Sequence, residues 1–357
     1  MRVLGLFDHA GVRRGQNRLP ADQQVSAPYC AHWLMDAGID LDPVMPARSP
    51  AHRKVRDVIE HRSGVAWDLA VRGIRQARPA DAVLAILEDK AVAPSILKRR
   101  HRTPYAQLPL VTVSCWWAEE LKNGTTARRR DILRTLSGVD AVIVFSANQR
   151  EIFADAGYPA DQVHPVRFGV DPHWYAPTAP AEESSTQERP VQILASGVDR
   201  GRDFDTLAEA ARLLPDLSFT VVTQVGRVKN PPPNMVLLPP VSPDEHRRLL
   251  QSAELVVVPT HDLAYPTGQS VLLEAMACGR PVAVTRTEAM DEYIRDGVAN
   301  LAMPHADAAG VARVIEGAMQ DVDLSRRLGT EARRLTSESW NFHSTWSAVA
   351  AVFRSIE

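Results

Sequence analysis

Residues 265–281 read Tyr265-Pro-Thr-Gly-Gln-Ser-Val-Leu-Leu-Glu-Ala-Met-Ala-Cys-Gly-Arg-Pro281, a glycine-containing loop that opens a short apolar helix. Gly279 is typical of a helix end, and Pro281 prevents the helix from continuing. The first backbone N–H groups of a helix have no partner inside it, and the helix dipole adds positive potential there. The segment therefore predicts a phosphate site at Gly268, Gln269 and Ser270, with Ser270 as the N-cap.

Glu274 is the only acid in this segment, and its neighbours from Val271 to Ala277 are apolar. We therefore expect much of the helix to be buried. A buried carboxylate needs hydrogen-bond partners, and the two hydroxyls of a ribose can supply them. A phosphate site with one acid a turn further along the helix is what binding of a nucleotide-sugar requires.

Length and composition favour a two-domain globular protein. The chain has 357 residues, 45% hydrophobic and 24% charged, with a net charge of −2. This balance gives no support to a nucleic-acid partner. Basic clusters at 98–102 and 128–130 indicate solvated surface, or alternatively a surface that attracts an anionic acceptor or a membrane. The three cysteines form no CxxC motif, so we expect no disulfide framework and no zinc site.

The sequence also favours a cytoplasmic protein. The N-terminal apolar run is too short for a signal peptide, and no stretch approaches the roughly 20 apolar residues that span a bilayer. Peripheral membrane contact stays open. No G-x-G-x-x-G motif follows a strand and no Walker P-loop is present, so the main support for NAD or P-loop nucleotide binding is missing.

Short apolar runs alternate with amphipathic segments of helix length, which predicts a parallel α/β architecture. We expect an N-terminal domain at 1–170, a proline-rich linker at 171–190, a second α/β domain at 191–336 and a C-terminal helical segment at 337–357. The predicted strands lie at 3–7, 82–87, 110–113, 141–145, 191–195, 218–223, 236–238, 255–259 and 281–284. The predicted helices include 21–37, 148–156, 205–214 and 243–252.

A second candidate site follows the first strand of the second domain. Gly197 and Gly201 allow close backbone approach, and Arg200 and Arg202 offer two guanidinium groups for a diphosphate. A turn with surface arginines is the alternative. Because ligands bind at the carboxyl ends of parallel strands, the cationic interpretation is favoured, and it supplies charge to stabilise a departing diphosphate.

Loops of the first domain supply weaker candidates for an acceptor site. The two adjacent tryptophans could form a platform for a sugar or be core residues, and His9 could be a base or structural. All the candidates follow predicted strands; they are His9, Gly11, Glu88, Ser114, Trp116 and Trp117.

Taken together, these segments resemble retaining glycosyltransferases of the GT-B fold, in the family 4 group. The segment 273–282 resembles the most recognisable motif of that group, and Phe168-Gly-Val-Asp171 resembles its interdomain Asn-Gly-Val-Asp. Phe145-Ser146 and the segments 291–297 and 337–340 add to the resemblance. It covers nearly all of the second domain and the end of the first.

The resemblance implies two Rossmann-like domains facing a cleft, with the C-terminal helix crossing back to the first domain. It implies that Arg200 and Arg202 contact the diphosphate, beside Gly197, and that Glu274 binds the ribose. Backbone groups around Val241 would hold the base. No cofactor and no metal ion are implied.

One departure from the family pattern concerns the donor sugar. The family usually has a second acid eight positions before Glu274, where this chain has Pro266. The family's usual active-site histidine would fall near Ser114. The resemblance therefore implies an atypical donor sugar, or one held by backbone groups with Thr267 or Gln269.

These observations and the resemblance predict a metal-independent glycosyltransferase that uses a nucleotide-diphosphate sugar, with GDP or UDP as the nucleotide. Retention of configuration at the anomeric carbon is implied by the resemblance alone. The acceptor could be a small molecule, a lipid or a glycan. Two alternatives stay open: a phosphorylase or sugar-phosphate synthase of the same fold, and a non-catalytic nucleotide-sugar-binding protein.

Overall fold

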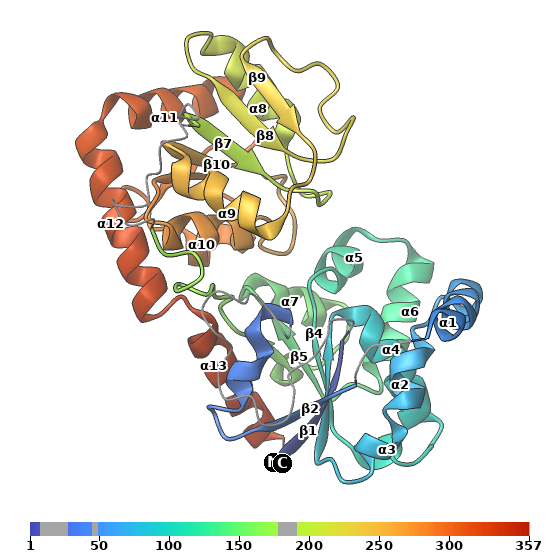
Figure 1. Ribbon diagram of the computed structural model, residues 1–357. Coiled ribbons are helices and arrows are strands. Elements are labelled where there is room, and N and C mark those ends of the chain that lie inside the picture. Colours follow the sequence, from blue (N-terminus) through green and yellow to red (C-terminus); the bar gives the residue numbers. More distant parts are fainter. Residues whose placement is uncertain (8–27, 45–48, 178–190, 357) are drawn as a thin grey trace. The chain divides into compact units, whose positions relative to one another are not determined.

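A computed structural model describes residues 1–7, 28–44, 49–177 and 191–356 of the chain. The chain divides into two compact units, the first formed by Met1–Arg167 with Phe342–Glu357 and the second by Phe168–Asn341. Each unit contains one six-stranded parallel sheet flanked by helices (Figure 1). Two α/β domains were predicted from the alternation of apolar runs and amphipathic segments, and this fold class is confirmed.

The sheet of the first unit has the strand order β2-β1-β3-β4-β5-β6. Strands buried on both faces must be apolar throughout, and β3 and β5 are buried at every position. The order changes direction between β1 and β3, the point at which open parallel sheets bind their ligands. The strands are β1 (Arg2–Leu6), β2 (Asp40–Pro43), β3 (Ala82–Ile86), β4 (Leu110–Val113), β5 (Ala141–Val144) and β6 (Val163–Pro165).

Side-chain caps begin several helices of the first unit. Ser49 accepts from the backbone N–H of His52 at the start of α1, and Thr125 does the same for α6. These helices and 3-10 helices (η) are η1 (Pro28–Leu34), α1 (Pro50–Ser63), α2 (Trp67–Arg72), α3 (Ile74–Ala77), α4 (Glu88–Arg99), η2 (Tyr105–Gln107), α5 (Trp117–Asn123), α6 (Thr126–Leu136), α7 (Asn148–Asp155), η3 (Ala160–Gln162) and α13 (Phe342–Ser355).

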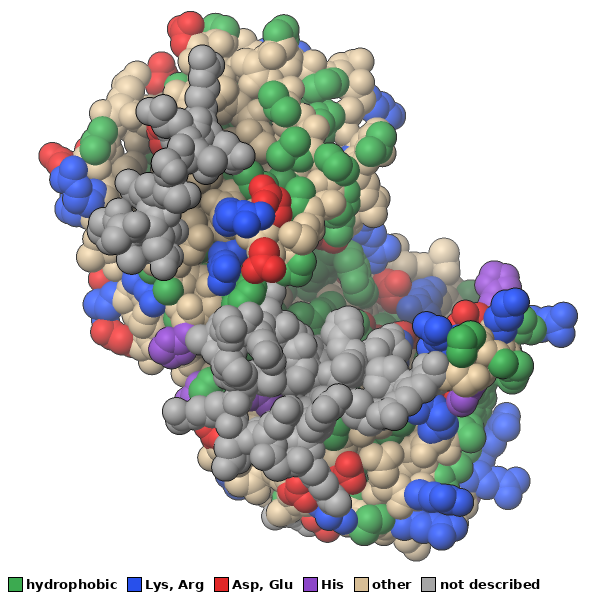
Figure 2. Space-filling model, in the orientation of Figure 1, with side chains coloured by type: hydrophobic (Ala, Val, Ile, Leu, Met, Phe, Trp, Pro, Cys, Tyr) green, Lys and Arg blue, Asp and Glu red, His purple; other side chains and the backbone are tan. Residues whose placement is uncertain are grey.

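Helix α1 differs from the other described α-helices because it buries none of its residues. It exposes Val55, Val58 and Ile59 beside basic side chains, and Figure 2 shows apolar, basic and histidine side chains together at this edge of the unit.

The predicted helix at 21–37 is wrong in its described part. Residues 28–34 form a 3-10 helix in which Tyr29 and Cys30 have positive φ angles of 52° and 54°. Pro28 disfavours helical geometry in the residue before it and has no N–H to donate, so an α-helix cannot run smoothly through this position. Residues 21–27 lie outside the described residues.

The sheet of the second unit has the order β12-β11-β10-β7-β8-β9. Read from the other edge this is 3-2-1-4-5-6, the doubly wound order, and its direction changes between β7 and β10. Ligands of such sheets bind outside the carboxyl ends of the strands at that point. The strands are β7 (Ile193–Ser196), β8 (Phe219–Val222), β9 (Met235–Leu238), β10 (Leu255–Val258), β11 (Val282–Thr285) and β12 (Leu301–Met303).

Asp203, Ser242, Asp307 and Asp321 each cap a helix of the second unit by accepting from a backbone N–H three residues further on. Pro243 at the first position of α9 suits its fixed φ angle. The helices are α8 (Phe204–Leu213), α9 (Pro243–Ser252), α10 (Gln269–Ala277), η4 (Glu288–Tyr293), α11 (Ala308–Gln320) and α12 (Val322–Glu338).

The C-terminal helix α13 packs in the first unit, although the chain enters it from the second. The indole Nε1 of Trp346 donates to the carbonyl of Tyr29 at 2.5 Å, and Thr345 Oγ1 donates to the carbonyl of Arg167 at 3.0 Å. The predicted helical segment at 337–357 is two pieces, because α12 ends at Glu338 and α13 begins at Phe342.

The first part of the predicted linker is not a linker. Residues 171–177 belong to the second unit, and Trp174 and Tyr175 are buried there. The guanidinium of Arg247 in α9 lies 4.0 Å from the centre of the Trp174 ring, a cation–π contact that holds this segment. The remainder, 178–190, lies outside the described residues.

The basic clusters are partly neutralised by neighbouring acceptors. Lys98 pairs with the carboxylate of Asp140, and Arg128 Nη2 lies 2.7 Å from Glu120 Oε2. These pairs favour the interpretation as ordinary charged surface. Among the described helices, none is both long enough and apolar enough to cross a membrane.

Candidate active site

Two loops of the second unit meet where the strand order changes direction. One follows β7 and the other follows β10. The backbone N–H of His261 donates to the carbonyl of Gly201 at 2.9 Å, and that of Asp203 donates to Pro259 at 3.2 Å. Arg202 and Thr260 also form an isolated bridge. The loops at 197–204 and 261–269 are therefore held together as one structure.

Arg202 lies at the centre of this structure and is only 3% exposed. Its Nε atom is 3.2 Å from Asp199 Oδ2, while Nη1 is buried and finds no hydrogen-bond partner among the described residues. Burial lowers the pKa of the guanidinium, and the charges of Asp199 and Glu274 oppose that change. An arginine stays protonated in proteins, so this is a buried cation with one donor group free for a ligand.

Two glycines enclose the guanidinium. A Cβ atom added to Gly197 would lie 2.1 Å from Arg202 Nε, and one added to Gly268 would lie 2.2 Å from Nη1. Gly268 also has a φ of 87°, which L residues with a side chain rarely adopt. Glycine is thus required at both positions if Arg202 is to keep this placement.

Asp199 positions both Arg202 and the loop before α10. Its Oδ1 atom accepts from the backbone N–H of Gly201 at 2.8 Å and from Thr267 Oγ1 at 3.0 Å. Thr267 is 2% exposed and this bond uses its hydroxyl proton, so it cannot donate to a ligand while the bond is kept.

Helix α10 begins at Gln269 with Gly268 at the N-cap, and no side chain of the described chain caps it. The prediction of Ser270 as the N-cap is therefore wrong, because Ser270 lies inside the first turn. Gln269 is 9% exposed, and its Oε1 atom has no partner within the described residues. The uncapped first turn leaves backbone N–H groups for an anion.

Glu274 lies in α10 and keeps 20% of its side-chain surface exposed. Burial raises its pKa to about 7, while a hydrogen bond with Tyr175 and the charge of Arg202 act in the opposite direction. Its Oε2 atom is 3.7 Å from His246 Nδ1 of α9. The carboxylate therefore lies in a mostly buried polar group that a ligand can still reach.

His246 is neutral at ordinary pH. Burial, followed by the charge of Arg202, lowers its pKa to about 4. Its Nε2 atom is buried and has no partner in the described part of the chain. Sequence reasoning missed His246 and Tyr175 because each belongs to a different segment, and only the fold brings them to Glu274. It missed Asp199, three residues before Arg202 in the same loop, because the spacing does not show that this carboxylate faces the guanidinium.

Two other predicted donor-site residues are less buried than Arg202. Arg200 is exposed on the turn before Arg202, and Arg227 Nη2 donates to the carbonyls of both, at 3.1 and 3.2 Å. Val241 is half-buried and precedes Ser242, the N-cap of α9. Arg227 is a further basic residue that the sequence did not single out.

The described acceptor candidates of the first unit meet at the start of α5. Glu88 Oε1 accepts from Ser114 Oγ at 3.0 Å and from the backbone N–H groups of Cys115, Trp116 and Trp117, the last at 3.3 Å. Burial raises the pKa of Glu88, and its hydrogen bonds oppose the rise. The acid thus occupies a helix N-terminus that could otherwise bind an external anion.

Of the two interpretations of Trp117, platform or core, the structure supports the core, because its side chain is 2% exposed. Trp116 is half-buried and keeps surface for a contact. His9 and Gly11 lie outside the described residues.

Both units are Rossmann-like domains, and together they have the GT-B fold of glycosyltransferases. Residues 196–321, which carry Arg202, His246 and Glu274, match the family model described as Glycosyl transferases group 1.

Similar proteins agree with this class. The MMP alpha-(1→4)-mannosyltransferase of Mycolicibacterium hassiacum is 25% identical over 260 residues, which are 68% of this chain and 61% of that protein. A D-inositol 3-phosphate glycosyltransferase of an Arthrobacter species is 36% identical over 203 residues, 55% of this chain and 43% of that protein. The matches thus span less than two thirds of each relative.

Among solved structures, Anabaena HepE in complex with UDP-glucose aligns over 100% of both chains with a TM-score of 0.70 and 16% identity. This likeness concerns the fold.

Proposed function

We propose that the chain is a retaining glycosyltransferase that takes its sugar from a nucleoside-diphosphate donor bound by the second unit. The observation that carries this proposal is the buried guanidinium of Arg202, whose Nη1 has no hydrogen-bond partner among the described residues and lies against the Gly268 N-cap of α10. A fixed cation beside an uncapped helix N-terminus is complementary to a diphosphate.

In this proposal the diphosphate lies against Arg202 and the first turn of α10, with Arg200 as an outer contact. Glu274 accepts hydrogen bonds from the ribose hydroxyls, and backbone groups around Val241 hold the base. The unpartnered Oε1 of Gln269 is available to a hydroxyl of the donor sugar. The acceptor binds the first unit, with Trp116 as its candidate contact there.

The reaction begins with the acceptor hydroxyl on the same face as the leaving group. Its oxygen forms a bond to the anomeric carbon while the bond from that carbon to the diphosphate oxygen breaks, and the hydroxyl proton passes to the leaving phosphate. Arg202 and the α10 N-terminus stabilise the charge that develops on the diphosphate. The proposed reaction therefore needs no metal ion and no cofactor. Retention of configuration rests on the family resemblance.

Two observations bear on the donor. HepE was solved with UDP-glucose, which makes UDP the first nucleotide to test. Position 266 is a proline and offers no carboxylate. The carboxylate of Asp199 pairs with Arg202 and accepts a hydrogen bond from Thr267. The sugar end of the site therefore depends on Gln269 and backbone groups, which supports a donor sugar other than a common hexose.

The test is a thermal-shift panel of UDP, GDP, ADP and TDP, followed by a transfer assay with sugars of the nucleotide that binds. A ligand at about 100 times its Kd adds about 2.7 kcal/mol of stability, which is readily measured. Stabilisation by one nucleotide and release of that nucleotide in the presence of an acceptor would support the proposal. Binding without transfer across a broad acceptor panel would favour a non-catalytic nucleotide-sugar-binding protein instead.

A further inference from the structure

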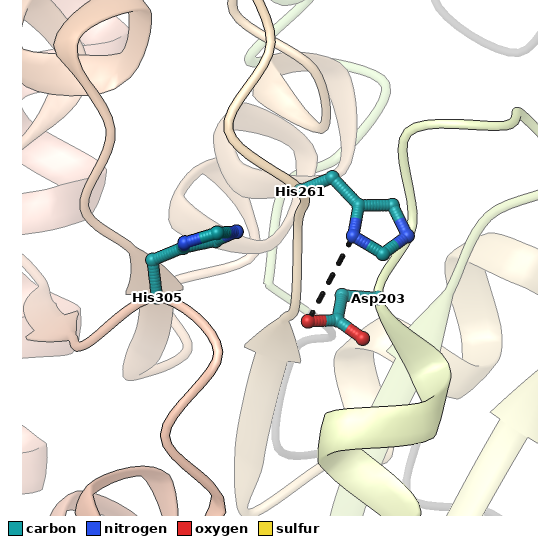
Figure 3. A group of neighbouring side chains, drawn as sticks. All are labelled: Asp203, His261 and His305. Carbon is teal, nitrogen blue, oxygen red and sulfur yellow. Dashed lines mark ion pairs between the residues drawn. The ribbon is translucent and has the colours of Figure 1, made fainter.

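A second polar cluster lies beside the candidate active site, in the same unit. Asp203, His261 and His305 each bring one possible ligand atom within 4.8 Å of the other two. Figure 3 shows the carboxylate and the ring nitrogens of the two histidines turned toward one space. We propose that these three residues bind a divalent transition-metal ion, with Zn²⁺ as the ion to test.

The three ligands come from three loops at the carboxyl edge of the sheet. Asp203 precedes α8, His261 follows β10, and His305 lies between β12 and α11. Backbone hydrogen bonds fix the first two, because Asp203 N donates to Pro259 and His261 N donates to Gly201. The ligands are therefore held on a formed scaffold.

The donor set suits a metal of this class. Two imidazole nitrogens with one carboxylate oxygen are a recurrent three-ligand set of zinc and of related transition metals. His261 is 47% exposed, so an ion can enter and water can complete the coordination. Mg²⁺ prefers oxygen ligands and is expected to bind poorly at this site.

The Asp203 carboxylate is already oriented by a second set of contacts. Its Oδ1 atom accepts from Thr206 N at 3.1 Å and its Oδ2 atom accepts from Thr206 Oγ1 at 2.7 Å. Such outer hydrogen bonds fix the direction in which a metal ligand points. His305 Nε2 accepts from Asp262 N at 3.2 Å, a bond that metal ligation through this atom would replace.

A simple aspartate–histidine pair is the competing explanation. His261 Nδ1 lies 3.9 Å from Asp203 Oδ2, longer than a hydrogen bond. In the first unit, His52 and Asp68 form a direct pair at 2.5 Å, and Arg72 neutralises the same carboxylate at 2.8 Å. The cluster of Asp203, His261 and His305 differs from that pair in two ways. It has a second imidazole and no arginine, and its ligand atoms are spaced widely enough to surround an ion.

Metal binding would join the loops that carry the diphosphate contacts. Asp203 is the neighbour of Arg202, and His261 is hydrogen-bonded to Gly201. The expected effect is a stiffer loop around Arg202 and a more stable second unit. The metal site itself does not depend on the proposed glycosyl transfer.

The test is calorimetric titration of Zn²⁺ into the metal-stripped 357-residue chain. We expect one ion per chain, and at least about a tenfold loss of affinity in His261→Ala and in His305→Ala. Asp203→Asn should also weaken binding, while the asparagine can still cap α8. His52→Ala is the matched control and should bind Zn²⁺ like the wild type.

A second readout separates the site from general zinc binding to surface histidines. Co²⁺ bound by the wild type should show visible d–d absorption of low-coordinate geometry, and both histidine variants should lose it. Circular dichroism checks that each variant is folded. The proposal is overturned if His261→Ala and His305→Ala bind Zn²⁺ with wild-type affinity, or if the wild type binds no more tightly than either variant.

Discussion

The guanidinium of Arg202 lies directly against Gly268, so closely that a Cβ atom on that glycine would come within 2.2 Å of Nη1. The placement of Arg202 therefore depends on Gly268, the N-cap of α10. The cation needs a position without a side chain, and the helix N-terminus gains a charge beside it.

Gly268→Ala should displace Arg202 and weaken nucleotide binding. Gly226→Ala is the matched control, because Gly226 has a similar φ of 81° but nothing within 4 Å of its added Cβ. Both variants carry backbone strain of about 1–2 kcal/mol, but only Gly268→Ala also meets the guanidinium. Denaturant unfolding and nucleotide titration of both variants measure the difference. Equal loss of nucleotide affinity in the two variants would contradict the proposed contact.

Glu274→Ala should weaken nucleoside-diphosphate binding by more than about tenfold, since a hydrogen bond to a charged group is worth about 1.5–3 kcal/mol. The comparison with the deoxyribonucleotide makes the test specific, because a nucleotide without the 2′-hydroxyl should bind wild type more weakly but lose less on mutation. Calorimetry measures both. Unchanged affinity in Glu274→Ala would refute the ribose assignment.

The stability of Glu274→Gln relative to wild type should depend on pH. The pKa of Glu274 is raised from 4.5 to about 7 in the folded protein, so the folded state binds more protons than the unfolded state between these values. Its contribution to stability is therefore present below pH 4.5 and lost as the pH rises through about 7. His246, with a pKa lowered from 6.5 to about 4, contributes in the opposite direction, with stability lost as the pH falls.

Removing the carboxyl group leaves the His246 contribution alone. Glu274→Gln should thus gain stability relative to wild type between pH 5 and pH 8, by about 1–3 kcal/mol. Urea unfolding at both pH values, without nucleotide, gives the difference directly. If the stability difference between Glu274→Gln and wild type is the same at both pH values, Glu274 is ionised at both.

A fragment of residues 168–341 should fold and bind the same nucleotide as the full chain. It is continuous in sequence, forms the second compact unit, and contains Tyr175, Arg202, His246 and Glu274. The matched fragment 191–341 lacks Trp174 and Tyr175 and should bind more weakly. Circular dichroism and nucleotide titration test both. A folded 168–341 fragment that binds no nucleotide would place essential donor contacts in the first unit.

Much of the fold follows from the sequence because both sheets are parallel and buried. Apolar runs such as Val-Ile-Val at 142–144 have no polar face, and they alternate with amphipathic helices. β2 was missed because Asp40-Leu-Asp-Pro43 is an edge strand with two acids and a proline, so it lacks the apolar run of the buried strands. The 3-10 helix at 28–34 was missed because periodic apolar residues cannot reveal the positive φ angles of Tyr29 and Cys30.

The sequence predicts only part of the candidate site. Gly197, Arg202, Gly268 and Glu274 stand in segments whose spacing indicates a phosphate-binding loop or helix start. The residues that set the electrostatics of these four do not stand in segments with such a pattern. His246 is one histidine on an amphipathic helix, and Tyr175 lies in a proline-rich stretch with the composition of a linker. Only their burial beside Glu274 distinguishes them from surface residues.

The central claim, that Arg202 binds the diphosphate of a nucleotide, is tested most directly by calorimetric titration of UDP, GDP, ADP and TDP into wild type and Arg202→Ala. Arg313→Ala, which removes a 72% exposed arginine of the same unit, is the control. We predict that at least one nucleotide binds the wild type and the control equally, and that Arg202→Ala binds it at least about tenfold more weakly. Equal affinity for that nucleotide in Arg202→Ala and wild type would contradict the account.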